Sequence, residues 1–381
     1  MLKALSVENF DRNFSHERES MLESLDSEWR GSTLVRDAIV GLLEARTGDG
    51  FLEEDEDVRV QGVKSMGRVW HGDETAKTFL YNVITRTNAA GRIEEPVEHA
   101  WKAAFESLAD GWSEDSSARD WLLSFLTDRP AVPMHEKFLF HVRSQVPWTL
   151  GRGWKNDAFV RERLIAGVNT TSSFKLNRAA ILNALGQHWK GDADLKPVFV
   201  SVLTSRGKDG KPIMEDIEER VAAIYCLAAG WPSDPVVKTV LLSLVCGDEY
   251  VTVDPSEIVR SLAIETLASN SPGDPIVGAF LMSIIKARDA GGDFVESAKH
   301  VRSSAAKSLA AHWPNNQEIR EHLLHYLNTR RKDGTFAETF CYARNSVVFG
   351  FRAKWKRCGE LRDTLCSLLN NRTEQKAIAE L

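Results

Sequence analysis

Apolar residues recur along the chain with the spacing of one helix face, and a tryptophan follows most of these stretches. Before Trp231, apolar or small side chains stand four, five, seven and eight positions upstream. After it, apolar side chains stand six, ten, thirteen and fourteen positions downstream. Both spacings place these side chains on one face of a 3.6-residue helix. The pattern therefore predicts a helix, a tight turn at the tryptophan, and a second helix.

The same pattern returns along nearly the whole chain. With Trp231 as the anchor, the equivalent positions are Trp29, Trp70, Trp112, Trp154, Trp189, Trp231, Ser271, Trp313 and Trp355. Successive anchors are 40–42 residues apart, except for 35 residues between Trp154 and Trp189. Neither helix of such a unit can bury its apolar face alone, so neighbouring units must stack. We therefore predict an all-α solenoid of about nine helical-hairpin repeats, with two arms, residues 1–170 and 171–381.

Polar residues after each anchor mark the start of the second helix. An aspartate or asparagine three positions after the anchor can accept backbone N–H bonds as an N-cap. Pro235 and Pro275 then occupy the first helical position, where no N–H is needed. The predicted caps are Asp73, Asp115, Asp157, Asp192, Asp234, Asp274 and Asn316. The tryptophans themselves are predicted to be core residues.

Arginines form two columns in the repeat. One stands eleven positions before eight of the nine anchors, including Arg178, Arg220, Arg260, Arg302 and Arg344. A structural ladder would bond each guanidinium to carboxylates or carbonyls of adjacent loops, whereas a basic track would bind phosphate or an acidic partner. A second column stands seventeen positions after the anchor, and it too could be structural or partner-binding. In the structural interpretation, each arginine would interact with the C-terminal carbonyls of its helix. Its members are Arg46, Arg129, Arg206, Arg288, Arg330 and Arg372.

Further candidate partner-binding residues stand where the repeat is irregular. Trp101 replaces the arginine of the third unit, and Trp148 follows Pro147 inside a predicted helix. Extra aromatic residues of this kind are either additional core residues or binding hot spots. The densest basic patch combines Arg330, Arg331 and Lys332 with residues 352–357. This patch is either a solvated face or a contact surface for an acidic partner. Our candidate partner-binding set consists of Trp101, Trp148, Arg330, Arg331, Lys332 and the five arginines from Arg178 to Arg344.

Catalytic and metal-binding motifs are not found in the sequence. It has no GxxxxGK[ST], GxSxG or HExxH motif. His16-Glu17 and His135-Glu136 stand at different offsets from their anchors, so they are not expected to converge on one metal. His322 and His325 form a two-ligand spacing without a third ligand in view. We expect no catalytic activity, no metal and no cofactor.

The charge distribution and the cysteines limit the expected partners and the expected cellular compartment. The net charge of −6 gives no global basic signature of nucleic-acid binding. Residues 1–57 carry six basic and fifteen acidic residues, whereas residues 328–381 carry eleven basic and six acidic ones. These ends could associate between molecules in a salt-sensitive way. The sequence has five cysteines and no CxxC pair, which favours a reducing, cytoplasmic setting. It contains no stretch of 18 apolar residues, so we predict no membrane span.

Three segments carry a resemblance to a known family. "ERVAAIYCLAAGWPSDP" (219–235), "VRSLAIETLASNSPGDP" (259–275) and "VRSSAAKSLAAHWPNNQ" (301–317) resemble HEAT repeats. The Gly-Trp-x-x-Asp turn is similar to that of bacterial HEAT arrays found behind NACHT-type signalling ATPase domains. The resemblance implies a non-catalytic scaffold or sensor array that binds another protein in bacterial signalling or defence. A nucleic-acid-binding HEAT-like protein is the alternative, and a HEAT-like DNA glycosylase is a distant third.

Overall fold

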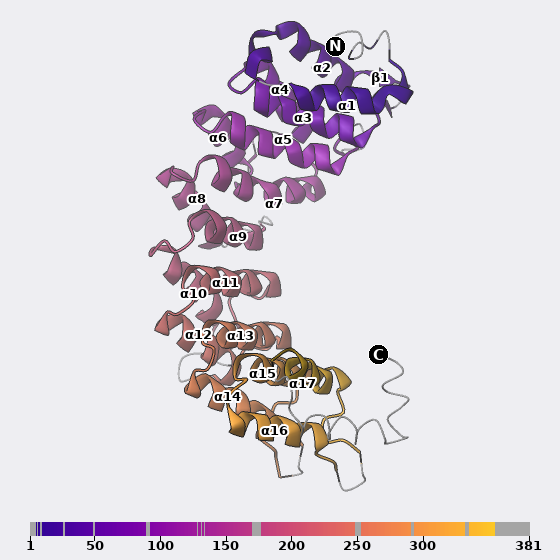
Figure 1. Cartoon of the computed structure of the whole chain (residues 1–381). Coiled ribbons are helices and arrows are strands. Elements are labelled where there is room, and N and C mark those ends of the chain that lie inside the picture. The colour runs from indigo at the N-terminus through magenta and orange to yellow at the C-terminus, as the bar shows by residue number, and fades with distance from the viewer. Residues whose placement is uncertain are drawn as a thin grey trace. The chain divides into compact units, whose positions relative to one another are not determined.

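A computed structural model gives the arrangement of the helices (Figure 1). It describes residues 5, 7, 10–25, 27–48, 50–88, 92–127, 129, 130, 132, 134–169, 177–247, 253–290, 293–331 and 335–354. Within these ranges the chain forms seventeen α-helices and one two-stranded ladder. The prediction of an all-α fold is therefore confirmed for the described part of the chain.

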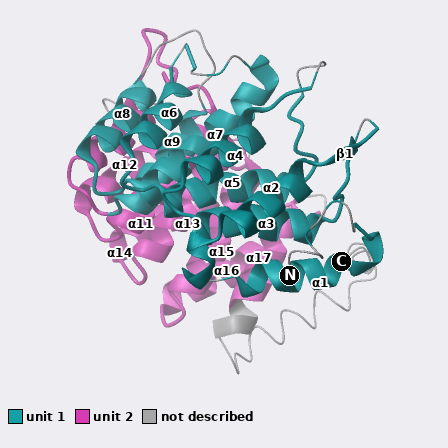
Figure 2. Cartoon of the chain, turned by 90° about the horizontal axis from the view of Figure 1, so that it is seen from above, with its two compact units in different colours: residues 1–190 teal, residues 191–381 magenta. Residues whose placement is uncertain are grey.

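The chain divides into two compact units, residues 1–190 and 191–381 (Figure 2). We expected a division at residues 170 and 171, which lie outside the described residues. Helix α9 contacts both α7 and α8, which places it in unit 1 rather than in unit 2.

Unit 1 contains nine α-helices among its described residues, and it also holds the two-stranded ladder. Two 3-10 helices, Arg12–Phe14 and Ser27–Gly31, flank α1. The strands β1 (Arg46–Thr47) and β2 (Gly50–Phe51) pair antiparallel. The α-helices are α1 (Ser15–Ser24), α2 (Thr33–Glu44), α3 (Glu56–Val69), α4 (Glu74–Thr85), α5 (Glu98–Gly111), α6 (Ser116–Ser124), α7 (Glu136–Gly153), α8 (Ala158–Asn169) and α9 (Arg178–His188).

Unit 2 has eight α-helices in its described part. They are α10 (Leu195–Thr204), α11 (Ile217–Gly230), α12 (Pro235–Cys246), α13 (Glu257–Asn270), α14 (Pro275–Lys286), α15 (Lys299–His312), α16 (Gln317–Asn328) and α17 (Cys341–Lys354).

The odd-numbered helices, which we call the first helices, form one layer within each unit. In unit 1, α1, α3, α5, α7 and α9 each contact the next member of the series, as do α11, α13, α15 and α17 in unit 2 (Figure 1). The even-numbered second helices pack on this layer, each against the first helix that follows it in the chain. Each pair thus buries one apolar face of each helix between two layers.

The turn between first and second helix has the same hydrogen bonds at most anchors. The N–H of Trp70 donates to the carbonyl of Met66 at 3.2 Å, and the Trp70 carbonyl accepts from the N–H of Asp73 at 3.0 Å. The Asp73 side chain then accepts from the Ala76 N–H at 2.9 Å and caps α4. Equivalent side-chain caps are present at Asp115, Asp157, Asp234, Asp274 and Asn316.

One predicted cap is wrong. Helix α10 begins at Leu195 with Asp194 at its N-cap position, and Asp194 makes no capping bond with its side chain. Asp192 accepts from the Asp194 N–H at 3.0 Å and so stabilises the turn before the helix. The second helix starts later here than after the other anchors, a shift that the local sequence pattern does not reveal.

The tryptophan column is core in some pairs and not in others. Trp70, Trp112, Trp154 and Trp313 are at most 5% exposed, which confirms the prediction there. Trp29, Trp189 and Trp231 are only partly buried, so the prediction of a fully buried column is wrong at these positions. Trp29 lies in a 3-10 helix instead of ending an α-helix, and Trp231 packs beside Phe199 with ring centroids 6.1 Å apart. Trp355 is outside the described residues.

Candidate interaction surfaces

Most side chains of the first arginine column are buried, and they lie where the long loops enter the first helices. Arg220 Nε lies 3.0 Å from Asp254 Oδ2, and these two side chains are 2% and 0% exposed. Arg220 Nη1 also donates to the carbonyl of Met214 at 2.6 Å. We call this set the arginine ladder. Its ion pairs are Arg18–Glu53, Arg59–Glu95, Arg220–Asp254, Arg260–Glu296 and Arg302–Glu338.

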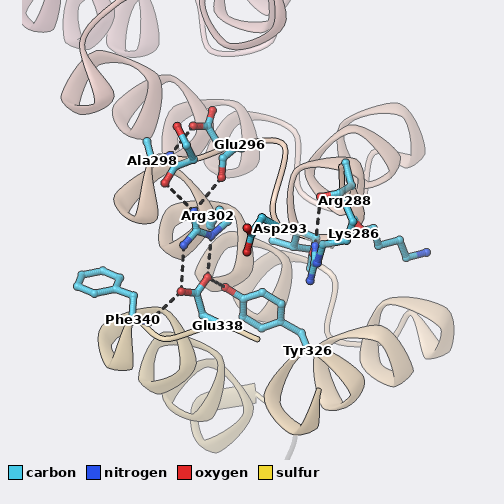
Figure 3. A network of polar contacts seen from close by, with 12 residues as sticks. Lys286, Arg288, Asp293, Glu296, Ala298, Arg302, Tyr326, Glu338 and Phe340 are labelled. Atoms are coloured by element: carbon cyan, nitrogen blue, oxygen red, sulfur yellow. Dashed lines mark hydrogen bonds and ion pairs between the residues drawn. The ribbon is translucent and has the colours of Figure 1, made fainter. Parts of the chain in front are cut away.

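The best-connected pair of the ladder is Arg302 with Glu338 (Figure 3). Arg302 donates to both carboxylate oxygens of Glu338 at 2.7 and 3.0 Å, and the Tyr326 hydroxyl donates to the same carboxylate at 2.8 Å. Burial alone would raise the pKa of Glu338, but the hydrogen bonds from Arg302 and from the Phe340 N–H hold that pKa below its ordinary value. The carboxylate is therefore ionised at neutral pH and neutralises the arginine.

The acidic partners form a column that the sequence analysis missed. Each stands seventeen positions before the next anchor, at Glu53, Glu95, Asp254, Glu296 and Glu338. The signal was visible as an acid three residues before the start of each of these first helices. Arg220, Arg260 and Arg302, expected as candidate partner contacts, are instead engaged by these carboxylates because a buried guanidinium needs a paired charge. Their contacts support the structural interpretation of the column.

The second arginine column meets the first on an aromatic ring. Phe294 lies between Arg288 and Arg302, whose guanidinium carbons are 3.4 and 4.4 Å from the ring centroid. Phe336 lies in the same way between Arg330 and Arg344, at 4.1 and 3.8 Å. Such cation–π contacts are worth roughly 0.5–2 kcal/mol, depending on how far the cation is desolvated. The aromatic residues stand nineteen positions before the next anchor, and the sequence analysis did not use them.

Helix C-terminal carbonyls are also partners of this second column, as its structural interpretation predicted. Arg288 donates to the carbonyl of Ile285 at 3.0 Å, at the end of α14. Arg206 donates to the carbonyl of Leu203 at 2.7 Å, at the end of α10. The positive side chains thus satisfy the last acceptors of the helices that precede them.

A second series of ion pairs joins the helix caps at the opposite edge, where the short turns lie. Lys77 Nζ lies 2.7 Å from the carboxylate of Asp115, the N-cap of the next second helix. Burial raises the pKa of Asp115, but hydrogen bonds from Lys77, Ser117 and two backbone N–H groups together lower it to about 2. We call this series the cap ladder. Its pairs are Arg36–Asp73, Lys77–Asp115, Arg119–Asp157, Lys196–Asp234 and Lys238–Asp274.

One position in the cap ladder has no cation. Gly278 stands seven residues after its anchor, where the other pairs have lysine or arginine. Trp313 occupies the space instead, and its Nε1 donates to the carbonyl of Asp274 at 3.2 Å. A Cβ atom at Gly278 would lie 2.9 Å from Trp313 Nε1. The glycine is therefore required by the close approach of the indole ring.

The remaining candidates are scattered over the molecule. Trp101, expected on a partner-binding surface, is instead buried at 7% exposure and donates from Nε1 to the Ile84 carbonyl at 3.2 Å. Trp148 is 40% exposed, with its ring 4.6 Å from that of His188. Arg331 is exposed and lies 3.1 Å from the carboxylate of Asp293. Arg178 and Arg344 are partly buried, Arg330 is exposed, and Lys332 lies outside the described residues.

Exposed aromatic and aliphatic residues lie on the free side of the first helices in unit 2, beside the ion pair of Lys307 with Glu265. Tyr225 on α11 and Phe349 on α17 are 57% and 65% exposed. Both stand six positions before their anchors, as Trp148 does in unit 1. Ile258 on α13 and Tyr342 on α17 are 56% and 62% exposed, thirteen positions before theirs. Because residues seven apart lie on the same helix face, these side chains belong to one surface, which we call the first-helix face of unit 2.

Comparisons with known proteins add little to this picture. No protein-family model matches the chain, and no curated protein does. A solved structure described as an engineered protein is similar at 15% sequence identity, covering 97% of this chain and 94% of that one, with a TM-score of 0.37. At this score the similarity supports no conclusion about fold or function.

Two negative observations apply only to the part of the chain that the structure describes. No group of three or more His, Cys, Asp or Glu side chains there is arranged to hold a metal ion. None of the helices within those ranges combines the length and the apolar character that crossing a membrane requires.

Proposed function

We propose that the chain is an α-solenoid of about nine HEAT-like repeats that binds another protein and catalyses nothing. The order of contacts within each unit supports this architecture, because each first helix packs on the next in sequence. The two ladders support it as well, since each pair links residues 34–38 positions apart, about one repeat. Such arrays present long surfaces suited to macromolecular partners.

The observation that carries the binding role is the first-helix face of unit 2. Tyr225, Ile258, Tyr342 and Phe349 are each more than half exposed. Burying a large apolar side chain on binding contributes roughly 1.5–3 kcal/mol, and aromatic residues dominate binding hot spots. A protein partner is the class of molecule that uses such a surface. By its resemblance to HEAT arrays, we place this role in bacterial signalling or defence.

Nucleic-acid binding is the less favoured function. It relied on arginine columns as phosphate-binding tracks, and the ladder arginines already have carboxylate or carbonyl partners. A guanidinium that left such a pair would strand a buried carboxylate, which is costly. Self-association through the acidic and basic ends stays a prediction, since most of the basic end lies outside the described residues.

Site-specific photo-crosslinking in the native host tests the proposal. A benzophenone amino acid at Tyr225 or Phe349 should give a discrete adduct with one other protein. The matched control is the same substitution at Ile276, which is 67% exposed but lies on second helix α14. Adducts of equal yield at all three positions, or none at Tyr225 and Phe349, would contradict the proposal. Salt-sensitive DNA binding by the purified chain would favour the alternative.

A further inference from the structure

A recess of about 540 Å³ lies between α3, α5 and α7 on the free side of the first helices of unit 1. Gly67 on α3 and Ser107 on α5 form its floor. A Cβ atom at Gly67 would lie 2.7 Å from the Cα of Ser107, so only glycine permits this helix approach. The floor is therefore set by backbone packing, and the side chains of the three helices rise around it.

The α3 wall of the recess carries two cations without an anionic partner. Lys64 and Arg68 are one helical turn apart, and both are exposed. Arg68 donates only to neutral carbonyls, those of Leu22 at 2.7 Å and Glu23 at 3.2 Å. Lys64 has no hydrogen-bond or ion-pair partner among the residues that the structure describes. Like charges at this spacing repel each other, and an anion between them would relieve the repulsion.

The α5 wall carries the opposite charge. Glu106 and Asp110 are one helical turn apart there. Asp110 is neutralised by Arg152 of α7 through two hydrogen bonds of 2.8 and 2.7 Å. Glu106 stands in the same repeat position as Lys64, six before its anchor, yet no ion pair joins the two within the described residues. The recess therefore separates an unpaired positive wall from an unpaired carboxylate.

We propose that this recess binds a peptide segment of a partner protein in which a carboxylate side chain stands beside a positively charged one. Lys64 and Arg68 receive the carboxylate, and Glu106 receives the cation. A phosphate group fits less well, because its second negative charge would face Glu106 and Asp110. The inference rests on the proposed protein-binding function, but it assigns a second surface with different chemistry in the other unit.

Fluorescence anisotropy with labelled peptides and the full chain tests this at about 20 mM salt, where exposed charges are weakly screened. The probe is an eight-residue peptide with two Glu-Lys pairs separated by Gly-Ser. One comparator has Gln for Glu and another has Gln for Lys. The Glu-Lys peptide should bind tightest, and Lys64→Gln should weaken its binding about three- to tenfold, the range of one ordinary hydrogen bond made at an exposed site.

Matched variants locate the site. Lys307→Gln changes the lysine at the same repeat position in unit 2 and should alter binding less than about twofold, within the range of surface pairs. Glu106→Gln should weaken the Glu-Lys peptide but not the peptide that lacks lysine. The inference is overturned if the three peptides bind alike, if none binds saturably, if Lys307→Gln matches Lys64→Gln, or if inorganic phosphate displaces the probe more readily than acetate does.

Failure of this inference is distinguishable from failure of the proposed function. Crosslinking from Tyr225 and Phe349 reports on unit 2, whereas the peptide titration reports on Lys64 and Glu106 of unit 1. Crosslinks in unit 2 without saturable peptide binding would disprove the peptide site in the recess. The proposed protein-binding function of the first-helix face of unit 2 would still stand.

Discussion

The two units are alike at their edges and different on their first-helix faces. Both carry ladder arginines paired with buried acids, as in Arg59–Glu95 and Arg302–Glu338, and both carry capped second helices tied by cations. Six positions before the anchor, unit 1 has one aromatic residue, Trp148, and also Lys64 and Glu106, which form no ion pair within the described residues. Unit 2 has two aromatic residues there, Tyr225 and Phe349, and its lysine and glutamate, Lys307 and Glu265, lie 3.3 Å apart as an ion pair. The residues that repeat in the sequence build the stack. The residues that vary form the surfaces that a partner would meet.

The comparison also explains one irregular repeat. Trp101 stands where a ladder arginine would, and position 137, where its acidic partner would stand, holds lysine. Arg143 in the next repeat donates instead to the carbonyls of Phe125 and Thr127, at 2.8 and 2.7 Å. Arginine and acid are therefore both absent in the third repeat, whereas the fourth repeat keeps its arginine, Arg143, with carbonyl partners.

Trp70→Ala should give the largest effect on stability. Trp70 is 1% exposed, so its removal leaves a large cavity and should cost ~3–5 kcal/mol of unfolding free energy. Trp231→Ala, at an equivalent but partly exposed position, should cost about 1–2 kcal/mol, because less surface is lost from the core. Urea denaturation followed by circular dichroism measures both. Equal losses would show that Trp231 contributes to the core as much as Trp70 does.

Arg302→Ala should destabilise unit 2 by about 3 kcal/mol. It leaves Glu338 charged and 1% exposed without its main partner, and a stranded buried charge is strongly destabilising. The control is Arg331→Ala. The side chains of Arg331 and its partner Asp293 are 46% and 70% exposed, so this variant should lower the unfolding free energy by less than about 1 kcal/mol. Denaturant midpoints of the two variants test this. A small loss for Arg302→Ala would mean that the ladder does not hold the helices together.

Asp115→Ala should cost about 1 kcal/mol at neutral pH through loss of its cap and its ion pair with Lys77. The pKa of Asp115 lies at about 2 in the folded chain, below the unfolded value of about 3.9. The ionised form therefore contributes stability above about pH 4, and this contribution is lost as pH falls toward 2. Unfolding free energies measured between about pH 2 and pH 7 should show that the difference between the wild type and Asp115→Ala decreases as the pH falls.

The neutral cap of unit 2 is the control for this pH dependence. Asn316 accepts from the Ile319 N–H at 3.0 Å and carries no charge. The effect of Asn316→Ala should therefore stay constant over the same pH range. A pH-dependent loss at Asn316, or a constant loss at Asp115, would contradict the assignment of the lowered Asp115 pKa to hydrogen bonds from Lys77, Ser117 and backbone N–H groups.

Local signals in the sequence predicted much of this fold, and long-range partners were harder to see. Asp73 and Asp234 could be identified as caps because a cap bonds residues two or three positions away. The burial of Trp231 depends on helices distant in sequence, so its partial exposure was not predictable. The acids that pair with the ladder arginines recur as a column in the sequence. A single sequence does not show that this acidic column packs against the arginine column. Trp101 was assigned to the surface for the same reason.

Tyr225→Ser and Phe349→Ser should have the smallest effect on stability. Both side chains are more than half exposed, so unfolding free energies should change by less than about 0.5 kcal/mol. The same variants should weaken capture of the protein crosslinked at these positions. Thermal melts and a pull-down of that protein separate the two effects, and a large stability loss would show that the first-helix face of unit 2 is part of the core.

The arginine side-chain signals in a proton–nitrogen correlation spectrum test the central claim most directly. If the ladder is structural, the Nε–H groups of Arg59 and Arg302 exchange slowly with water and keep their chemical shifts when a short DNA duplex is added at low salt. Exposed Arg163, whose side chain has no hydrogen bond within the described residues, serves as the internal reference for fast exchange. Ladder signals that exchange as fast as that of Arg163, or that shift on DNA addition, would contradict the account and restore the arginine column as a binding track.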